Sequence, residues 1–166
     1  MANVTVSDNR RAYDAIMREV RRMGRATVTI GIHGDAGQHR EAEGMTVAQI
    51  GAVHEFGTAE IPERSFLRAT VDGDATIAEY AEDQVREVAT GKTYATKAAN
   101  RIGLVAVGAV KRRIQTRIPP PLSEATRAKR TAKAAHGGGL AGMGGAQTPL
   151  IDSGQLIQSI QYRAEV

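Results

Sequence analysis

Large side chains that could anchor a hydrophobic core are scarce in this chain, and their scarcity limits the folds open to it. The chain has four tyrosines, two phenylalanines and no tryptophan, against 18 glycines. The aromatic residues are Tyr13, Phe56, Phe66, Tyr80, Tyr94 and Tyr162. A core built on alanine, valine and isoleucine favours an extended or thin fold. Such a fold can complete its burial against partner subunits.

The length of the chain fits one compact domain, which we assign to residues 1–166. The absence of cysteine excludes a disulfide scaffold, a thiolate zinc site and a cysteine nucleophile. The longest apolar runs fall far short of the ~20 residues that a membrane-spanning helix needs. The first residues lack the apolar segment of a signal peptide. We therefore expect a soluble protein that is made in the cytosol and has no membrane partner.

Apolar residues recur at helical spacing over most of the chain. Helices are predicted over residues 9–23, 45–56 with Thr46 as the cap, 65–88 with a break near Gly73, 94–117, and 154–160 with Asp152 or Ser153 as the cap. Alternation predicts a strand over 26–33, and 161–166 is a second candidate strand. The predicted fold is α+β, a helix-rich single domain with a small antiparallel sheet. Because two strands do not complete a sheet, we expect a further strand elsewhere in the chain or from a neighbouring subunit.

Three consecutive prolines at 119–121 end the longest predicted helix rigidly. After them the sequence predicts a short basic helix capped by Ser123, and then a tract with six glycines between residues 136 and 147. Nothing in that tract can offset the entropy that is lost on ordering. We therefore predict a long flexible, Gly-rich loop over about 122–147 that orders only in an assembly.

The net charge of +4 conceals a strong separation of charge along the chain. Residues 55–88 contain nine acidic and three basic residues, a local net charge of −6. Residues 97–133 contain ten basic residues and one acidic residue, a local net charge of +9. Such a separation is typical of a nucleic-acid surface or of complementary patches on stacked subunits. A solvated charged face with no partner is the third possibility.

No pattern in the sequence predicts catalysis, a metal or a cofactor. The pair His54-Glu55 is followed by Thr58 where the zinc-protease motif needs a second histidine. The loop at 33–43 carries histidines and carboxylates, but their spacing matches no established metal site. Ser153 does not lie in a G-x-S-x-G elbow and is better explained as a helix cap. We therefore expect a protein that is not an enzyme and has no catalytic, cofactor-binding or metal site.

Three blocks of sequence together indicate a family. They are VAQIGAVHEFGTAEIPERSFLR at 47–68, IPPPLSEATRAKR at 118–130 and TPLIDSGQLIQSI at 148–160, and they cover 48 of the 166 residues. In this order they resemble the small neck or tail-completion proteins of tailed bacteriophages, also described as head–tail joining or virion morphogenesis proteins. The first block is similar to the family's "hEfGt…iPeRpFlr" signature, with Ser65 in place of the usual proline. The second and third are similar to its "ppLs..T...K" and "PLidtG.L..si" segments.

The resemblance implies a structural role in the virion, at the neck between head and tail, for a protein made in the host cytoplasm. Such proteins form a homo-oligomeric ring, commonly a hexamer, that joins the head connector to the tail. Adjacent partners are connector or stopper proteins and tail-terminator or tube proteins, and genome DNA passes through the lumen without sequence-specific contacts. The alternatives are a tail terminator ring protein and a basic nucleic-acid-binding protein. An enzyme that uses His54 and Glu55 is a third hypothesis.

We expect the interface between subunits to come from the three blocks and the basic segment. The candidates are Glu55, Phe56, Gly57, Pro62, Arg64, Phe66, Arg68, Lys111, Arg112, Arg113, Arg117, Leu122, Leu150 and Ile151. For the first block an internal helix–turn–helix corner is an equal alternative, in which Gly57 takes a positive φ and ends the helix. If their segment is helical, Arg64 and Arg68 lie on one face. The stretches 55–88 and 97–133 are candidates for opposed charged surfaces, and the segment 122–147 for the part that reaches a neighbouring ring.

Overall fold

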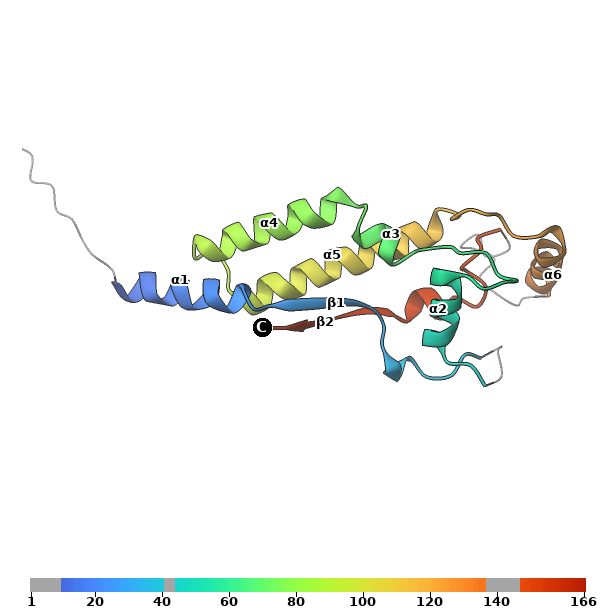
Figure 1. Ribbon diagram of the computed structural model, residues 1–166, viewed down its shortest axis with the longest axis horizontal. Coiled ribbons are helices and arrows are strands. Elements are labelled where there is room, and N and C mark those ends of the chain that lie inside the picture. The colour runs from blue at the N-terminus through green and yellow to red at the C-terminus, as the bar shows by residue number, and fades with distance from the viewer. Residues whose placement is uncertain (1–9, 41–43, 137–146) are drawn as a thin grey trace, which may run out of the picture.

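The computed structural model describes residues 10–40, 44–136 and 147–166, which form an elongated α+β domain (Figure 1). Both the helix-rich character and the small antiparallel sheet confirm the prediction from sequence. The elements in chain order are α1 (Arg10–Met23), β1 (Thr27–Ile32), the 3-10 turn η1 (Gly34–Ala36), α2 (Val47–Phe56), α3 (Arg68–Val71), α4 (Ala75–Ala89), α5 (Ala95–Gln115), α6 (Glu124–Ala135), α7 (Gln155–Gln158) and β2 (Ile160–Glu165). No helix in the described ranges is long and apolar enough to cross a membrane.

The sheet pairs the first predicted strand with the C-terminal one. β1 and β2 run antiparallel, from the pair Thr27–Glu165 at one end to Ile32–Ile160 at the other. Both predicted strands are therefore confirmed. Within the described residues the sheet has no third strand. A strand contributed by a neighbouring subunit stays a prediction.

Helix α5 is the central element of the fold. Helix α4 packs against it on one side and the sheet packs against it on the other (Figure 1). Its buried residues are small over the first half: Ala95, Ala98, Ala99, Gly103 and Ala106. Because these side chains are short, neighbouring elements approach the backbone of α5 closely. The ring of Tyr162 on β2 lies so close that a Cβ atom at Gly103 would be 2.2 Å from the ring carbon Cδ2. The thin shape therefore follows from the scarcity of large side chains.

Most element boundaries agree with the periodicity of the sequence. The predicted break near Gly73 is confirmed, because Asp74 caps a new helix, α4, by accepting from the backbone N–H of Thr76. The predicted helix at 154–160 is only the single turn α7, since Ile160 already pairs with β1. Its cap is neither Asp152 nor Ser153 but Gly154, whose φ of 77° is left-handed.

The segment after the three prolines is partly described. The short basic helix predicted there is confirmed as α6, with the Ser123 hydroxyl accepting from the N–H of Thr126. The glycine tract at 137–146 lies outside the described residues, and so does Asn9, the predicted first residue of α1.

Two glycines of α5 offer a matched test of this packing. Gly103→Ala places a methyl group inside the Tyr162 ring and should destabilise the fold by about 1–3 kcal/mol, the usual cost of overpacking. Gly108→Ala meets only the tip of the Arg112 side chain, at 3.4 Å, and should stabilise by up to about 1 kcal/mol through helix propensity. Urea unfolding of both variants checks the pair. Equal effects of the two substitutions would contradict the close approach of β2 to α5.

Candidate functional site

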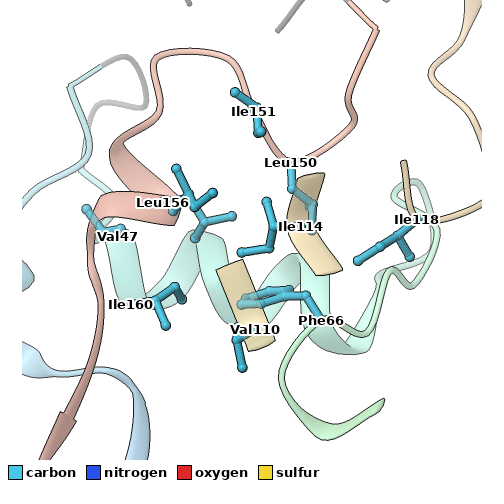
Figure 2. Close-up of a cluster of buried hydrophobic side chains, with 10 residues drawn as sticks. Val47, Phe66, Val110, Ile114, Ile118, Leu150, Ile151, Leu156 and Ile160 are labelled. Atoms are coloured by element: carbon cyan, nitrogen blue, oxygen red, sulfur yellow. The ribbon is translucent and has the colours of Figure 1, made fainter. Parts of the chain in front are cut away.

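The three sequence blocks meet around the C-terminal half of α5, where the larger apolar side chains gather (Figure 2). Phe66 comes from the first block, Ile118 from the second, and Leu150, Ile151 and Leu156 from the third. All five are buried, and Phe66 and Ile151 are completely inaccessible to solvent. Segments that are far apart in the sequence therefore form one hydrophobic cluster.

The carboxylate of Glu55 organises the first block. Glu55 lies in the last turn of α2 and is only 4% exposed. Its Oε1 accepts hydrogen bonds from the Ser65 hydroxyl at 2.7 Å and from the N–H of Arg68 at 2.9 Å. Its Oε2 accepts from the N–H groups of Phe66 at 2.8 Å and Leu67 at 2.9 Å. One buried carboxylate thus satisfies three consecutive backbone N–H groups at the start of α3.

These hydrogen bonds also decide the charge state of Glu55. Burial acts to raise the pKa of the Glu55 carboxyl, because it disfavours the charged form. The hydrogen bonds from Leu67, Ser65, Arg68 and Phe66 act in the opposite direction and prevail, so the pKa lies below its ordinary value. The side chain of Glu55 is therefore a carboxylate at neutral pH. Each of its two oxygens accepts two hydrogen bonds from residues 65–68.

A left-handed glycine turns the chain at the end of α2. We call the segment that connects α2 to α3, residues 57–67, the corner. Gly57 has a φ of 72°, and its N–H donates to the carbonyl of Val53 at 2.9 Å. A Cβ atom at Gly57 would lie 2.8 Å from the backbone nitrogen of Glu63, so there is no room for a side chain. The predicted positive φ and the end of the helix at Phe56 are both confirmed.

Arg64 connects the first block to the second. Its Nε donates to the carbonyl of Pro120 at 2.9 Å and its Nη2 to the carbonyl of Pro121 at 3.3 Å. Burial lowers the pKa of Arg64, as does the nearby charge of Arg130. Arg64 is 6% exposed and does not lie in a helix, so it shares no helical face with Arg68.

Arg130 of α6 connects the second block to the third. Its Nη1 donates to the carbonyls of Thr148 at 2.8 Å and Ile151 at 2.9 Å, and its Nη2 donates to that of Pro149 at 3.2 Å. Asp152 lies against the same guanidinium, 4.0 Å from Nε. The planar guanidinium of Arg130 therefore supplies hydrogen-bond donors to the backbone carbonyls of residues 148–151, which have little regular structure.

The outer side of the corner carries an exposed aromatic residue. Phe56 is 65% exposed, and the Arg68 guanidinium lies over its ring at 5.6 Å from the centroid. Arg68 also pairs with Glu63 at 2.7 Å. Ile61, at the tip of the same loop, is 36% exposed. The exposed surface here therefore consists of an aromatic ring, an isoleucine and an arginine that is paired with a carboxylate.

The structure divides the predicted interface residues into three groups. Buried within the chain are Glu55, Arg64, Phe66, Leu150 and Ile151. Half-buried are Gly57, Lys111, Arg113 and Leu122. Exposed are Phe56, Pro62, Arg68, Arg112 and Arg117. The first group holds the corner together from within, so contact with another subunit in this conformation falls to the exposed group.

Sequence reasoning did not single out two residues that hold this site. Ser65 bridges Glu55 and the N–H of Ala69, and Arg130 joins the second and third blocks. Ser65 stands where the signature that the first block resembles has proline, and this departure is the one signal that could have drawn attention to it. Arg130 is one of ten basic residues in its stretch, and the signal that could have found it is its position, where the "ppLs..T...K" segment that the second block resembles has a lysine.

His54 borders a small pocket of about 190 Å³ beside Arg130 and Asp152. Among the described residues its Nδ1 is buried without a hydrogen-bond partner. Burial lowers the pKa of His54, and the charges of Arg64, Arg130 and His39 lower it further. No group of three histidine, aspartate or glutamate side chains that could hold a metal occurs within the described ranges. The loop residues 41–43 are not among them.

Comparison of the chain with models of protein families, with curated proteins and with solved structures gives no match. Function is therefore inferred from the three blocks and from the geometry of the corner they build.

Glu55→Gln tests the carboxylate directly. The amide keeps the size of the side chain, but its NH2 group faces backbone donors and leaves buried N–H groups unpaired. We expect a loss of roughly 2–4 kcal/mol in the free energy of unfolding. Glu60→Gln, in the exposed part of the same loop, is the control and should change stability by less than about 0.5 kcal/mol. Equal stability of the two variants in urea unfolding would refute the role of Glu55.

The same variant should alter the pH dependence of stability. A carboxyl whose pKa is lowered by folding contributes its full stabilisation above the unfolded-state value of 4.5, and the contribution is lost as the pH falls through the folded-state value. Wild-type stability should therefore decline with acid more steeply than that of Glu55→Gln, which has no group to titrate there. Parallel pH profiles of the two proteins would contradict the lowered pKa.

Proposed function

We propose that this chain is a structural subunit of a tailed bacteriophage, which forms a ring at the head–tail junction, joins the head connector to the tail and leaves a passage for DNA. The observation that carries the proposal is that three blocks similar in order to the neck and tail-completion family pack onto one another. Arg64 and Arg130 join them in sequence, first to second and second to third. Resemblance at three segments that pack into one cluster supports a shared fold better than resemblance at three scattered segments.

Adhesion between subunits is the mechanism that the surface supports. Phe56 and Arg68 are of residue types that are enriched in protein–protein interfaces, and they lie together on the outer side of the corner. Within the described residues β1 and β2 pair only with each other, so each has an outer edge that a neighbour's strand can extend. The elongated body and its small core fit a subunit that completes its burial in an assembly (Figure 1).

A nucleic-acid-binding protein is the alternative from another class. Several basic residues of the stretch 97–133 are engaged within the chain: Arg101 contacts Gln84 and Glu87, and Arg113 donates to the carbonyl of Ser65. This internal use reduces the number of cations available for phosphate contacts. Steep salt dependence of DNA binding by the isolated chain would favour the alternative.

Locating the subunit in phage particles tests the proposal. We expect gold-labelled antibody against the purified chain to mark the junction between head and tail in electron micrographs. Depletion of the chain should yield heads and tails that remain separate. Label on tails purified without heads identifies a tail terminator instead, and its absence from all particles contradicts a structural role in the virion.

A surface variant sharpens this experiment. Phe56→Ser removes an aromatic side chain that is 65% exposed, so it should reduce ring formation while leaving the fold intact. Tyr13→Ser on α1 removes one that is 63% exposed and is the matched control. The mass of the assembled species, measured by light scattering, should fall for the first variant only. Equal masses for both variants would exclude Phe56 from the interface.

A further inference from the structure

Strand β1 has an outer edge that its own sequence does not protect from pairing. Its residues are threonine, valine, isoleucine and glycine, with no charged side chain and no proline. Its register with β2 runs without a bulge from Thr27–Glu165 to Ile32–Ile160. Charges, prolines and bulges are the usual devices that keep a free strand edge from pairing with another chain. A strand rich in β-branched residues that lacks all three is suited to a second partner strand.

The backbone on the outer sides of both strands is available for hydrogen bonds. In an antiparallel pair, about half of the N–H and C=O groups of each strand point away from the partner strand. Among the residues that the structure describes, no backbone hydrogen bond joins residues 27–32 or 160–165 to any other element. Each copy of the chain therefore offers two different edges, one on β1 and one on β2, each of six residues.

A groove beside β2 is a second, independent observation at the same edge. Its volume is about 430 Å³, and among the described residues its walls come from α5 and β2, so it lies along the side of β2 that faces away from β1. Leu104 of α5, which is 61% exposed, lines the groove with Val107 and with the half-buried Tyr162 and Ala164 of β2. Because side chains alternate along a strand, a strand laid beside β2 would place every second side chain into this groove.

We infer that β1 of one subunit pairs antiparallel with the outer edge of β2 of the next subunit and covers the groove at Leu104. Val28 and Ile30, on the α5 side of β1, are only half-buried in their own chain and complete their burial in this contact. The inference rests on the proposed function and names the contact that joins neighbouring subunits. It also supplies the further strand that a two-stranded sheet needs.

The dimensions of the fold identify the occupant as a second copy of this chain. Neighbouring strands lie about 4.8 Å apart, so the two strands of one copy advance a continuous sheet by about 9.5 Å. Packed helices lie about 8–10 Å apart, and each copy contributes the one helix α5 over its two strands (Figure 1). Sheet and helix layers therefore repeat at the same interval. A second copy at the edge of β2 brings its own α5 beside Leu104.

Such a contact explains how one chain builds a ring. β1 and β2 are antiparallel within the chain, so copies in the same orientation also present antiparallel edges to each other. The two edges differ, and each subunit uses β1 on one neighbour and β2 on the other. A head-to-tail contact of this kind repeats and produces a closed ring when the rotation closes.

Single cysteines test the pairing, because the chain has none of its own. One protein carries Thr29→Cys in β1, and a second, with a tag of different length, carries Gln161→Cys, Arg163→Cys or Glu165→Cys in β2. All four positions are exposed on the outer face of the sheet. After mixing under mild oxidation, we expect a mixed disulfide in one of the three combinations, whose register brings the two Cβ atoms to about 4 Å. Thr29→Cys mixed with Glu79→Cys, at an exposed position of α4, is the control and should give no linked dimer.

A substitution in the groove provides a second readout. Leu104→Glu places a charge where the neighbour's strand lies and should weaken self-association about tenfold to a hundredfold in analytical ultracentrifugation. Val85→Glu makes the same change in charge at an apolar residue of α4 that is 48% exposed, and it should stay within about threefold of the wild type. Both residues are well exposed in the single chain, so both variants should fold, which circular dichroism checks.

Four results would overturn the pairing of β1 with β2 of the next subunit. They are no mixed disulfide in any of the three combinations, equal association of the Leu104 and Val85 variants, a wild-type chain that remains monomeric, and self-linked dimers of one cysteine variant in place of mixed ones. The last result indicates a two-fold contact between identical edges. If rings form without the mixed disulfide, this contact is wrong but the proposed function stands. If the wild-type chain forms no ring and is absent from phage particles, the proposed function itself fails.

Discussion

The carboxylate of Glu55 is the interaction on which the arrangement of the three blocks depends. It holds the N–H groups of Phe66, Leu67 and Arg68, which places Phe66 in the core and starts α3. The chain before these residues is therefore kept in the geometry in which Arg64 reaches Pro120 and Pro121. Without the carboxylate, one buried and two partly buried backbone donors would lose their partner, and the corner would open.

In this fold, arginine side chains donate to backbone carbonyls that helices and strands would otherwise pair with backbone N–H groups. The segments at 118–123 and 147–152 contain prolines and form no helix or strand, so their carbonyls need donors from other parts of the chain. Arg64 and Arg130 supply those donors, and Arg113 does the same for the carbonyl of Ser65. The irregular parts of the second and third blocks are thereby fixed against a core with one fully buried aromatic residue, Phe66.

The parts of the fold that the sequence predicts are those with a strong local signal. The apolar periodicity of 94–117, the alternation of 26–33 and the Thr46 cap each identify their element to within a few residues. The positive φ of Gly57 also follows from its place after a helix. These signals depend on neighbours in the chain and need no knowledge of the tertiary structure.

The remaining features depend on contacts between distant segments. The pairing of Ile160 with Ile32 shortens α7, and the burial of Arg64 depends on carbonyls more than 50 residues away. The same holds for Glu55: the sequence places it among the interface candidates, whereas the structure buries it with its carboxylate on the N–H groups of Phe66 to Arg68. The three blocks of sequence therefore locate the candidate site. Only the structure shows which of its residues hold the corner from within and which remain at the surface.

Amide hydrogen exchange of the isolated chain tests most directly whether the carboxylate of Glu55 holds the corner. The measurement follows the backbone N–H groups of Phe66, Leu67 and Arg68 by nuclear magnetic resonance. We predict that all three exchange as slowly as the protected amides of α5, because they open only with the surrounding fold. Exchange of these three amides within seconds, while α5 stays protected, would contradict the account.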